Sequence, residues 1–358
     1  MGPDLTFNGD FDAFVAKVNP GGTALVYAAY IGGTGGDGGL GIAVDGAGNA
    51  YVTGSTSSTE ASFPVTVGPD RTFNGPYQDA FVAKIASIPE WYLVTGVFDA
   101  AGFQELISPG SIVSVFGDFA ERTARATTIP LNMKLDGLSV SFNGIPGALF
   151  GVFGDDFGLG FNQANVQVPW ELDISSGPVE VRVHWERDDG EVWSEPFSVD
   201  AALASPGIFT FQFGPGQAIV TNFSLGNNDE IPGSVAQPEG FLPGVTGQPA
   251  TVGGVITVWC NGLGPVTLPP PTGDVPSAGN PLQETTKIVR LLIGGIEARI
   301  IGKPVLHPTL VGLNQINAFV PQGVTPGDAV PIVIEVDCGD GNVFRSRADV
   351  TIAVRPAP

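Results

Sequence analysis

Charge and long apolar runs are scarce in this 358-residue sequence. Charged residues make up 14% of the chain, with 15 Lys and Arg against 36 Asp and Glu. The resulting net charge of −21 argues against a nucleic-acid partner, because nucleic-acid binding depends on clustered Lys and Arg. It argues equally against binding to anionic membrane surfaces. No apolar run is long enough for a membrane-spanning helix, so membrane insertion is not expected.

Histidine is also scarce, with two residues in the whole chain. A Ser-His-Asp triad needs a histidine as general base, and neither His184 nor His307 lies near a G-x-S-x-G motif. Adjacent acidic pairs such as Asp188 and Asp189 fall in turns, where aspartate is favoured because it bonds its own backbone. The sequence therefore predicts no enzyme and no catalytic residue.

Glycine and proline are abundant instead, at 51 and 31 residues. Yet 43% of the chain is hydrophobic and 23 residues are phenylalanine, which is too much apolar surface for a disordered chain. We therefore interpret the Gly and Pro residues as turns between many short strands. The predicted fold class is all-β. Helix should be sparse, with any helical turn near Ala100–Leu106, where the β pattern is interrupted.

The first 88 residues contain an internal repeat. Asp12–Val18 (DAFVAKV) recurs 67 residues later as Asp79–Ile85 (DAFVAKI). Three further strand-like runs bounded by Gly, Asp or Asn lie between them, at 25–33, 40–49 and 50–58. Four strands per period is typical of a propeller blade. These phrases resemble the SBBP repeat, a bacterial β-propeller repeat, which implies one propeller-blade-like antiparallel sheet over residues 1–88.

A second repeat occupies the rest of the chain. Asn162-Gln163-x-Asn165 recurs 152 residues later as Asn314-Gln315-x-Asn317, and Val179–Trp193 matches Val330–Phe344 at an offset of 151. Gly110–Phe119 matches Gly253–Gly262 at an offset of only 143, so an insertion separates the two matches. We expect two copies of one β-sandwich, at 89–205 and 206–358. The segment 207–228 fits either sandwich or a connector.

The phrases ISPGSIVSVFG, NQANVQVPW and VGLNQINAFVPQGV carry a second resemblance. Residues 92–356 resemble the uncharacterised C-terminal domain of secreted acidobacterial-type proteins, and each half resembles an IPT/TIG immunoglobulin-like domain. The resemblance implies bacterial export and two tandem Ig-like sandwiches, without catalytic residues. Cys260 and Cys338, the two cysteines, each end a strand-like run. Because exported cysteines usually oxidise, we expect a disulfide between them, with two buried thiols as the alternative.

Calcium is the one ligand that the turns suggest. Hard cations need several oxygens that converge on one point, and oxygen-bearing side chains fall in Gly-rich turns. These candidates are Asp37, Asp45, Asn49, Asp155 and Asp156. However, the EF-hand spacing is absent, and turn chemistry explains each residue alone. We therefore expect no cofactor, and calcium stays an alternative.

Two functions compete. A lone blade leaves strand edges unpaired, which predicts an extracellular structural or adhesive cell-surface protein whose copies pair head to tail into a filament. The expected donor strand is Thr6–Val18, because it duplicates 72–85. Its assembly residues are Thr6, Phe7, Phe11, Phe14, Val15 and Val18. The alternative is a secreted propeller that binds a glycan or protein ligand and is completed by upstream blades.

Overall fold

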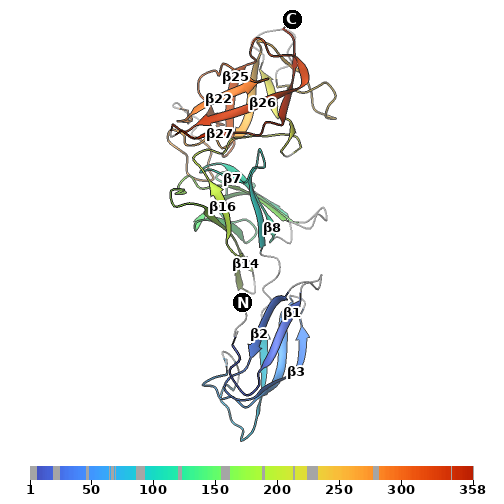
Figure 1. Ribbon diagram of the computed structural model, residues 1–358, viewed down its shortest axis with the longest axis vertical. Coiled ribbons are helices and arrows are strands. Elements are labelled where there is room, and N and C mark those ends of the chain that lie inside the picture. Colours follow the sequence, from blue (N-terminus) through green and yellow to red (C-terminus); the bar gives the residue numbers. More distant parts are fainter. Residues whose placement is uncertain are drawn as a thin grey trace. The chain divides into compact units, whose positions relative to one another are not determined.

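All regular structure in the described part of the chain is β structure. The computed structural model describes residues 6–18, 25–45, 48–63, 65, 68, 70–85, 93–119, 123–154, 162–187, 190–212, 214–223, 233–276, 282–339 and 341–357. Within these ranges no helix is long and apolar enough to span a membrane. Near Ala100–Leu106, where any helical turn was expected, residues 100–102 form a turn that is not helical. The chain divides into two compact units, Met1–Glu90 and Trp91–Pro358 (Figure 1).

The N-terminal unit contains the expected strands, but they divide between two sheets. The strands are β1 (Ala13–Val18), β2 (Leu25–Ile31), β3 (Asp37–Val44), β4 (Ala50–Thr56) and β5 (Asp79–Ile85). β1 and β2 form an antiparallel hairpin, and β3, β4 and β5 form an antiparallel three-stranded sheet. The expected single blade is therefore split, and β5 joins β4 instead of starting a separate sheet.

A small core lies between these two sheets. It consists of alternate residues of the strands together with one loop phenylalanine: Ala13, Val15, Tyr27, Ala29, Ile31, Ala50, Val52, Phe63 and Ile85. The period of two is what a strand with one buried face requires, because successive side chains point to opposite faces. The apolar alternation of the sequence thus explains why the hairpin packs on the sheet.

The described residues of the first sandwich form eleven strands. They are β6 (Leu93–Asp99), β7 (Leu106–Ile107), β8 (Ile112–Asp118), β9 (Ala124–Arg125), β10 (Leu138–Phe142), β11 (Ile145–Pro146), β12 (Ala148–Phe153), β13 (Asn162–Gln167), β14 (Val179–Arg187), β15 (Gly190–Trp193) and β16 (Phe197–Ala201). One sheet has the order β6-β8-β13-β12-β9, and the other has the order β11-β10-β14-β16-β7, with β15 paired to β14. The side chains between the two sheets form one continuous core.

In the second sandwich, twelve strands lie within the part of the chain that the structure describes. They are β17 (Gly207–Ile208), β18 (Gly216–Gln217), β19 (Val220–Phe223), β20 (Ala250–Thr251), β21 (Val255–Asn261), β22 (Ile288–Ile293), β23 (Ile296–Glu297), β24 (Val305–Leu306), β25 (Asn314–Phe319), β26 (Gly327–Asp337), β27 (Val343–Arg345) and β28 (Val350–Arg355). Its sheets have the orders β17-β21-β25-β24 and β18-β28-β26-β22-β23. The described part of 207–228 belongs here, because β17 and β19 pair with β21 and β18 pairs with β28.

The two sandwiches share one topology, which is that of an immunoglobulin domain. In each, one sheet has the strand order A-B-E-D and the other has the order C′-C-F-G, with a short N-terminal strand parallel to strand G. The pairing register also repeats. Gln163 lies opposite Phe116 on β8, and Gln315 lies opposite Trp259 on β21. The fold is thus all-β, with two tandem Ig-like sandwiches after the N-terminal unit.

The Asn-Gln-x-Asn motifs make equivalent hydrogen bonds in both sandwiches. Asn165 Oδ1 accepts hydrogen bonds from Ser114 Oγ (2.9 Å) and Gln163 Nε2 (2.7 Å). Asn317 Oδ1 accepts the corresponding bonds from Thr257 Oγ1 (2.8 Å) and Gln315 Nε2 (3.0 Å). These bonds tie β13 to β8 and β25 to β21, so the motif is part of the sheet architecture.

The insertion inferred from the unequal offsets joins the two sandwiches. It is part of 262–287, the connection from β21 to β22, which is longer than the corresponding connection 119–137. Gly273 N donates to Gln167 Oε1 (2.7 Å), and the carbonyl of Gly273 accepts from Leu131 N (2.7 Å). Leu131, Ala148 and Val311 form a small buried cluster beside it. The insertion therefore lengthens the contact between the sandwiches.

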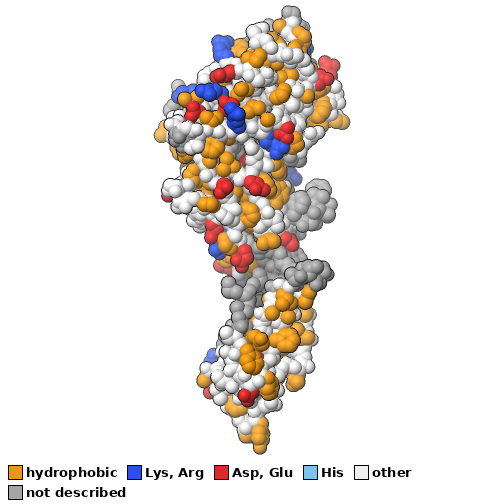
Figure 2. Space-filling model, in the orientation of Figure 1, with side chains coloured by type: hydrophobic (Ala, Val, Ile, Leu, Met, Phe, Trp, Pro, Cys, Tyr) orange, Lys and Arg blue, Asp and Glu red, His pale blue; other side chains and the backbone are white. Residues whose placement is uncertain are grey.

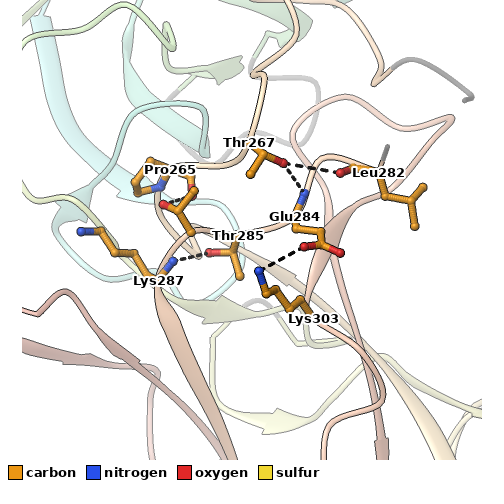
Figure 3. Close-up of polar contacts among 8 residues, drawn as sticks. Pro265, Thr267, Leu282, Glu284, Thr285, Lys287 and Lys303 are labelled. Atoms are coloured by element: carbon orange, nitrogen blue, oxygen red, sulfur yellow. Dashed lines mark hydrogen bonds and ion pairs between the residues drawn. The ribbon is translucent and has the colours of Figure 1, made fainter. Parts of the chain in front are cut away.

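Polar contacts hold the two ends of this connection together (Figure 3). Glu284 N donates to Thr267 Oγ1 (3.1 Å), and Thr286 Oγ1 donates to the Pro265 carbonyl (3.0 Å). Glu284 also forms an ion pair with Lys303 (3.2 Å). Both partners of that pair are well exposed, so it adds little stability and the backbone contacts matter more.

The predicted disulfide is not formed. Cys260 and Cys338 are buried thiols in the core of the second sandwich: Cys260 lies on β21, and Cys338 directly follows β26 of the facing sheet. Cys260 Sγ donates a weak hydrogen bond to the carbonyl of Asn314 (3.6 Å), on the neighbouring strand of its own sheet, instead of reaching across. Both cysteines act as small apolar core side chains. The alternative of two buried thiols is the one present in the structure.

Thiol labelling tests this correction. Burial raises the pKa of the Cys260 thiol far above its ordinary value, so almost no reactive thiolate forms in the native chain. We expect a maleimide to leave the native protein nearly unlabelled and to add two labels after unfolding without reductant. Labels that appear only after reduction would contradict the structure.

Candidate functional site: the uncovered faces of the N-terminal unit

The N-terminal unit exposes many large apolar side chains (Figure 2). They come from every part of the unit: Phe7, Phe11, Phe14, Val18, Leu25, Tyr30, Leu40, Ile42, Val44, Val65, Tyr77 and Val82. Single exposed apolar residues are ordinary, but a gathering of this size on a unit of 90 residues is typical of an interaction surface.

The two copies of the duplicated strand bury opposite faces. One face is buried in β1, and the other face is buried in β5. Val15 in β1 is 3% exposed, whereas the equivalent Val82 in β5 is 72% exposed. Phe14 in β1 is 75% exposed, whereas the equivalent Phe81 packs on Phe63 at 5.1 Å between ring centroids. Each copy therefore leaves uncovered the face that the other copy buries.

Two uncovered faces follow from this pattern. The hairpin face is the outer side of β1 and β2 and consists of Phe14, Ala16, Val18, Ala28 and Tyr30. The sheet face is the outer side of β4 and β5 and consists of Tyr51, Thr53, Ser55, Ala80, Val82 and Lys84. The internal contact between hairpin and sheet uses the opposite sides of the same strands. Each chain therefore carries both surfaces, the hairpin face and the sheet face, that a similar contact between copies would need.

Strand β3 adds an uncovered edge. It pairs with β4 alone in the described part of the unit. Ile42 and Val44 lie opposite the buried Val52 and Ala50, on the core side of the sheet, yet they are 62% and 66% exposed. The two-stranded hairpin is too narrow to cover this third strand. An exposed apolar edge of this kind is a template for pairing with another chain.

The predicted assembly strand is only partly available. Thr6, Phe7, Phe11, Phe14 and Val18 are exposed, but Val15 lies in the core of its own unit. β1 is also already paired with β2 along its length, and the Phe11 carbonyl accepts from Asp37 N (2.7 Å). The Ala13–Val18 part of the expected donor strand Thr6–Val18 is therefore already used within its own unit, because β1 supplies half of the pairing that holds the hairpin.

The calcium candidates are used in turns. Asp45 accepts from Asn49 N (2.9 Å) and Asn49 Nδ2 (2.9 Å), which closes the turn between β3 and β4. Asp37 accepts from Gly33 N (2.7 Å) and Ser58 Oγ (2.7 Å). The length of β3 separates Asp37 from Asp45 by about 25 Å, so they do not converge on one ion. Asp155 and Asp156 lie outside the described residues.

The loops of the unit carry depressed carboxyl pKa values. Hydrogen bonds from Thr72 hold the pKa of Asp70 below its usual range, and the Phe73 N–H does the same for Glu60. Asn8 N donates to Asp12 (2.9 Å) as Asn74 N donates to Asp79 (2.7 Å), so the turn before each AFVAK strand is also duplicated. These acids organise loops, and catalysis is not needed to explain them.

Neither histidine lies in the N-terminal unit. His307 stands edge-on to Trp259 at 5.3 Å between ring centroids, and partial burial lowers its pKa. His184 lies on β14 with two glutamates nearby. This grouping was not predicted from the sequence, because each residue was considered singly. Its signal was present as the alternation His184-x-Glu186 followed by Glu191 across a hairpin.

Comparison with known proteins supports the N-terminal repeat. Residues 26–60, which cover most of β2 to β4, match the family model of the SBBP β-propeller repeat. A search of curated proteins found no match. The resemblance of residues 92–356 to a C-terminal domain of secreted proteins stays a prediction.

Solved structures of tandem Ig domains are also similar. The tandem Ig repeats of Dlar match with 11% identity and a TM-score of 0.18, over 73% of this chain and 97% of that chain. The Ig1-2 module of the Drosophila receptor protein tyrosine phosphatase DLAR has the same identity and TM-score, over 72% and 97%. Titin A168–A169 matches with 10% identity and a TM-score of 0.16, over 75% and 98%. These TM-scores are too low to establish a shared fold. The Ig-like description is therefore based on strand order.

Proposed function

We propose that this protein is an extracellular structural or adhesive subunit whose copies associate head to tail through the N-terminal unit. The hairpin face of one copy stacks on the sheet face of the next. The observation that carries the proposal is the pair of equivalent strands, β1 and β5, which bury opposite faces inside one unit and expose the other two.

The intermolecular contact repeats the internal one. Inside the unit, the inner side of the hairpin packs on the inner side of the sheet. Between copies, the side of β5 that carries Val82 meets the side of β1 that carries Phe14. Such a contact is heterologous, so it forms a ring if the rotation closes and a filament if it does not. Repeat proteins stack their units in the same way.

The stacked contact buries exposed apolar side chains from both faces. These are Phe14, Val18 and Tyr30 of the hairpin face and Val82 of the sheet face. Each fully buried Val, Ile or Phe side chain contributes about 1.5–3 kcal/mol. The burial of several such side chains together exceeds the free-energy cost of association.

Two charge substitutions test the proposal. Phe14→Asp damages the hairpin face and Val82→Asp damages the sheet face, and both side chains already point outward. A loss of about 2 kcal/mol weakens association on the order of 30-fold. We expect wild-type protein to grow in size with concentration in light scattering and electron microscopy, and each variant to stay monomeric.

Mixing the variants distinguishes head-to-tail stacking from general stickiness. Each variant keeps one intact face, so an equimolar mixture is expected to form a discrete heterodimer and no larger species. Ile288→Asp, at an exposed apolar position on β22, is the matched control and is expected to assemble as wild type. A wild-type chain that stays monomeric at high concentration contradicts the proposal.

A secreted propeller that binds a glycan or protein ligand is the second candidate. The match of residues 26–60 to a β-propeller repeat favours it. In that case the same two faces stack on other repeats of a larger propeller. Wild type and both face variants then give the same size distribution, which separates this candidate from head-to-tail assembly.

A further inference from the structure

A cluster of one histidine and two glutamates lies on the hairpin formed by β14 and β15. The ligand atoms of His184, Glu186 and Glu191 all lie within 4.8 Å of one another. Glu186 follows His184 on the same face of β14, and Glu191 lies directly opposite Glu186 on β15. Strand geometry therefore places all three side chains on one face of the hairpin.

His184 is held in the orientation of a ligand. Its ring stacks on Trp193 at 4.1 Å between centroids, and its Nδ1 lies 3.4 Å from Ser139 Oγ. In the tautomer whose Nδ1–H donates to that hydroxyl, Nε2 carries the lone pair that a metal ion needs. Nε2 is buried, has no hydrogen-bond partner and lies 3.5 Å from Glu191 Oε2. Metal-binding histidines are oriented by a hydrogen bond at the other ring nitrogen in this manner.

The two glutamates need a cation between them. Like charges directly opposite each other on paired strands are destabilising. Lys134 forms an ion pair with one of the two, Glu186. The Glu191 carboxylate instead approaches the histidine ring, with 3.5 Å between Glu191 Oε2 and His184 Nε2.

The second sandwich shows that this hairpin folds without the cluster. Glu335 stands at the position of His184 and forms an ion pair with Arg345 (2.8 Å), which lies directly opposite. Asp337 stands at the position of Glu186 and faces Val343. Opposite charges or a charge beside an apolar residue suffice there, so the fold does not require a His-Glu-Glu grouping.

We infer that His184, Glu186 and Glu191 bind a divalent transition-metal ion of the Zn²⁺ class. Imidazole nitrogen and carboxylate oxygen are ligands that Zn²⁺ and Cu²⁺ accept, and three protein ligands leave a position for water. Both glutamates are exposed, so their side chains can rotate inward to close the spacing around an ion. The ion would replace the like-charge opposition by a shared ligand.

Titration of the full chain with Zn²⁺ in a calorimeter tests the inference. We expect one Zn²⁺ per chain for wild type, and at least about tenfold weaker binding for Glu191→Gln and Glu186→Gln, because each loses one ligand. Both positions are exposed, so these variants are expected to fold. Glu195→Gln, a nearby exposed glutamate outside the cluster, is the control and is expected to bind as wild type.

Cu²⁺ supplies a second readout at the site itself. Cu²⁺ quenches indole fluorescence at short range, and Trp193 stacks directly on His184. We expect saturable quenching in wild type, loss of most of it in Trp193→Phe, and retained Zn²⁺ binding in that variant. Absence of stoichiometric Zn²⁺ binding, or equal binding by wild type and Glu191→Gln, would overturn the inference.

Discussion

Gly110→Ala is expected to destabilise the chain by about 3 kcal/mol or more. Gly110 adopts φ +76 in the turn two residues before β8, and an added Cβ would lie 2.3 Å from ring atoms of Trp170. A left-handed backbone is unfavourable for alanine, and the rigid indole has to move as well. Urea unfolding monitored by circular dichroism measures the loss.

The duplication supplies the matched control for this substitution. Gly253 holds the equivalent position in the second sandwich, with φ +83, and the nearest atom to an added Cβ is Gln322 Nε2 at 2.8 Å. That atom ends a flexible side chain and moves at little cost. Gly253→Ala is therefore expected to cost about 1 kcal/mol, the backbone contribution alone. Equal losses for the two variants would show that the indole does not decide the effect.

Asn261→Ala is expected to uncouple the two sandwiches. The buried Asn261 side chain accepts from Ile112 N (2.9 Å) and donates to the Ile112 carbonyl (2.6 Å) across the contact between them. The carbonyl also accepts from Ala100 N, so the variant leaves mainly the Ile112 N–H without its partner. A buried unsatisfied group costs about 1–3 kcal/mol.

Calorimetry of the full chain checks this expectation. We expect wild-type Trp91–Pro358 to unfold in one cooperative transition and the variant to resolve two transitions, because the sandwiches have separate cores. Asp118→Ala is the control: Asp118 holds the equivalent strand position in the first copy and is exposed. Its expected effect is within about 0.5 kcal/mol. Two resolved transitions already in wild type would contradict the coupling.

The duplications could be recognised from the sequence because each repeated strand pairs with the equivalent strand in both copies. Gln163 and Gln315 were matched by their motifs, and the structure places them opposite Phe116 and Trp259 in the same register. The strands followed from alternation between polar and apolar residues. The insertion was also visible from unequal offsets, but its contact with Gln167 was not. An offset locates extra residues without saying what they touch.

Sequence patterns misjudged the features that depend on which sheet a strand joins. Two cysteines at the downstream ends of strands suggested a bridge, yet Cys260 is directed to Asn314 within its own sheet. Thr6–Val18 was expected to donate a strand to another copy, yet its Ala13–Val18 part pairs with Leu25–Ile31 of its own unit. A strand's own residues specify that it pairs, while partner choice depends on residues far away in the chain.

The sequence by itself determined the all-β class, the positions of the strands and both internal repeats, because a period of two and frequent Gly and Pro turns are local properties. Only the tertiary structure decided which face of each repeated strand is covered, as the contrast between Val15 and Val82 demonstrates. It also brought His184, Glu186 and Glu191 together, because the cross-strand pairing of Glu186 with Glu191 depends on hairpin register. Nearly identical strands expose different faces when their neighbouring strands differ. The packing of the whole unit determines which strands are neighbours.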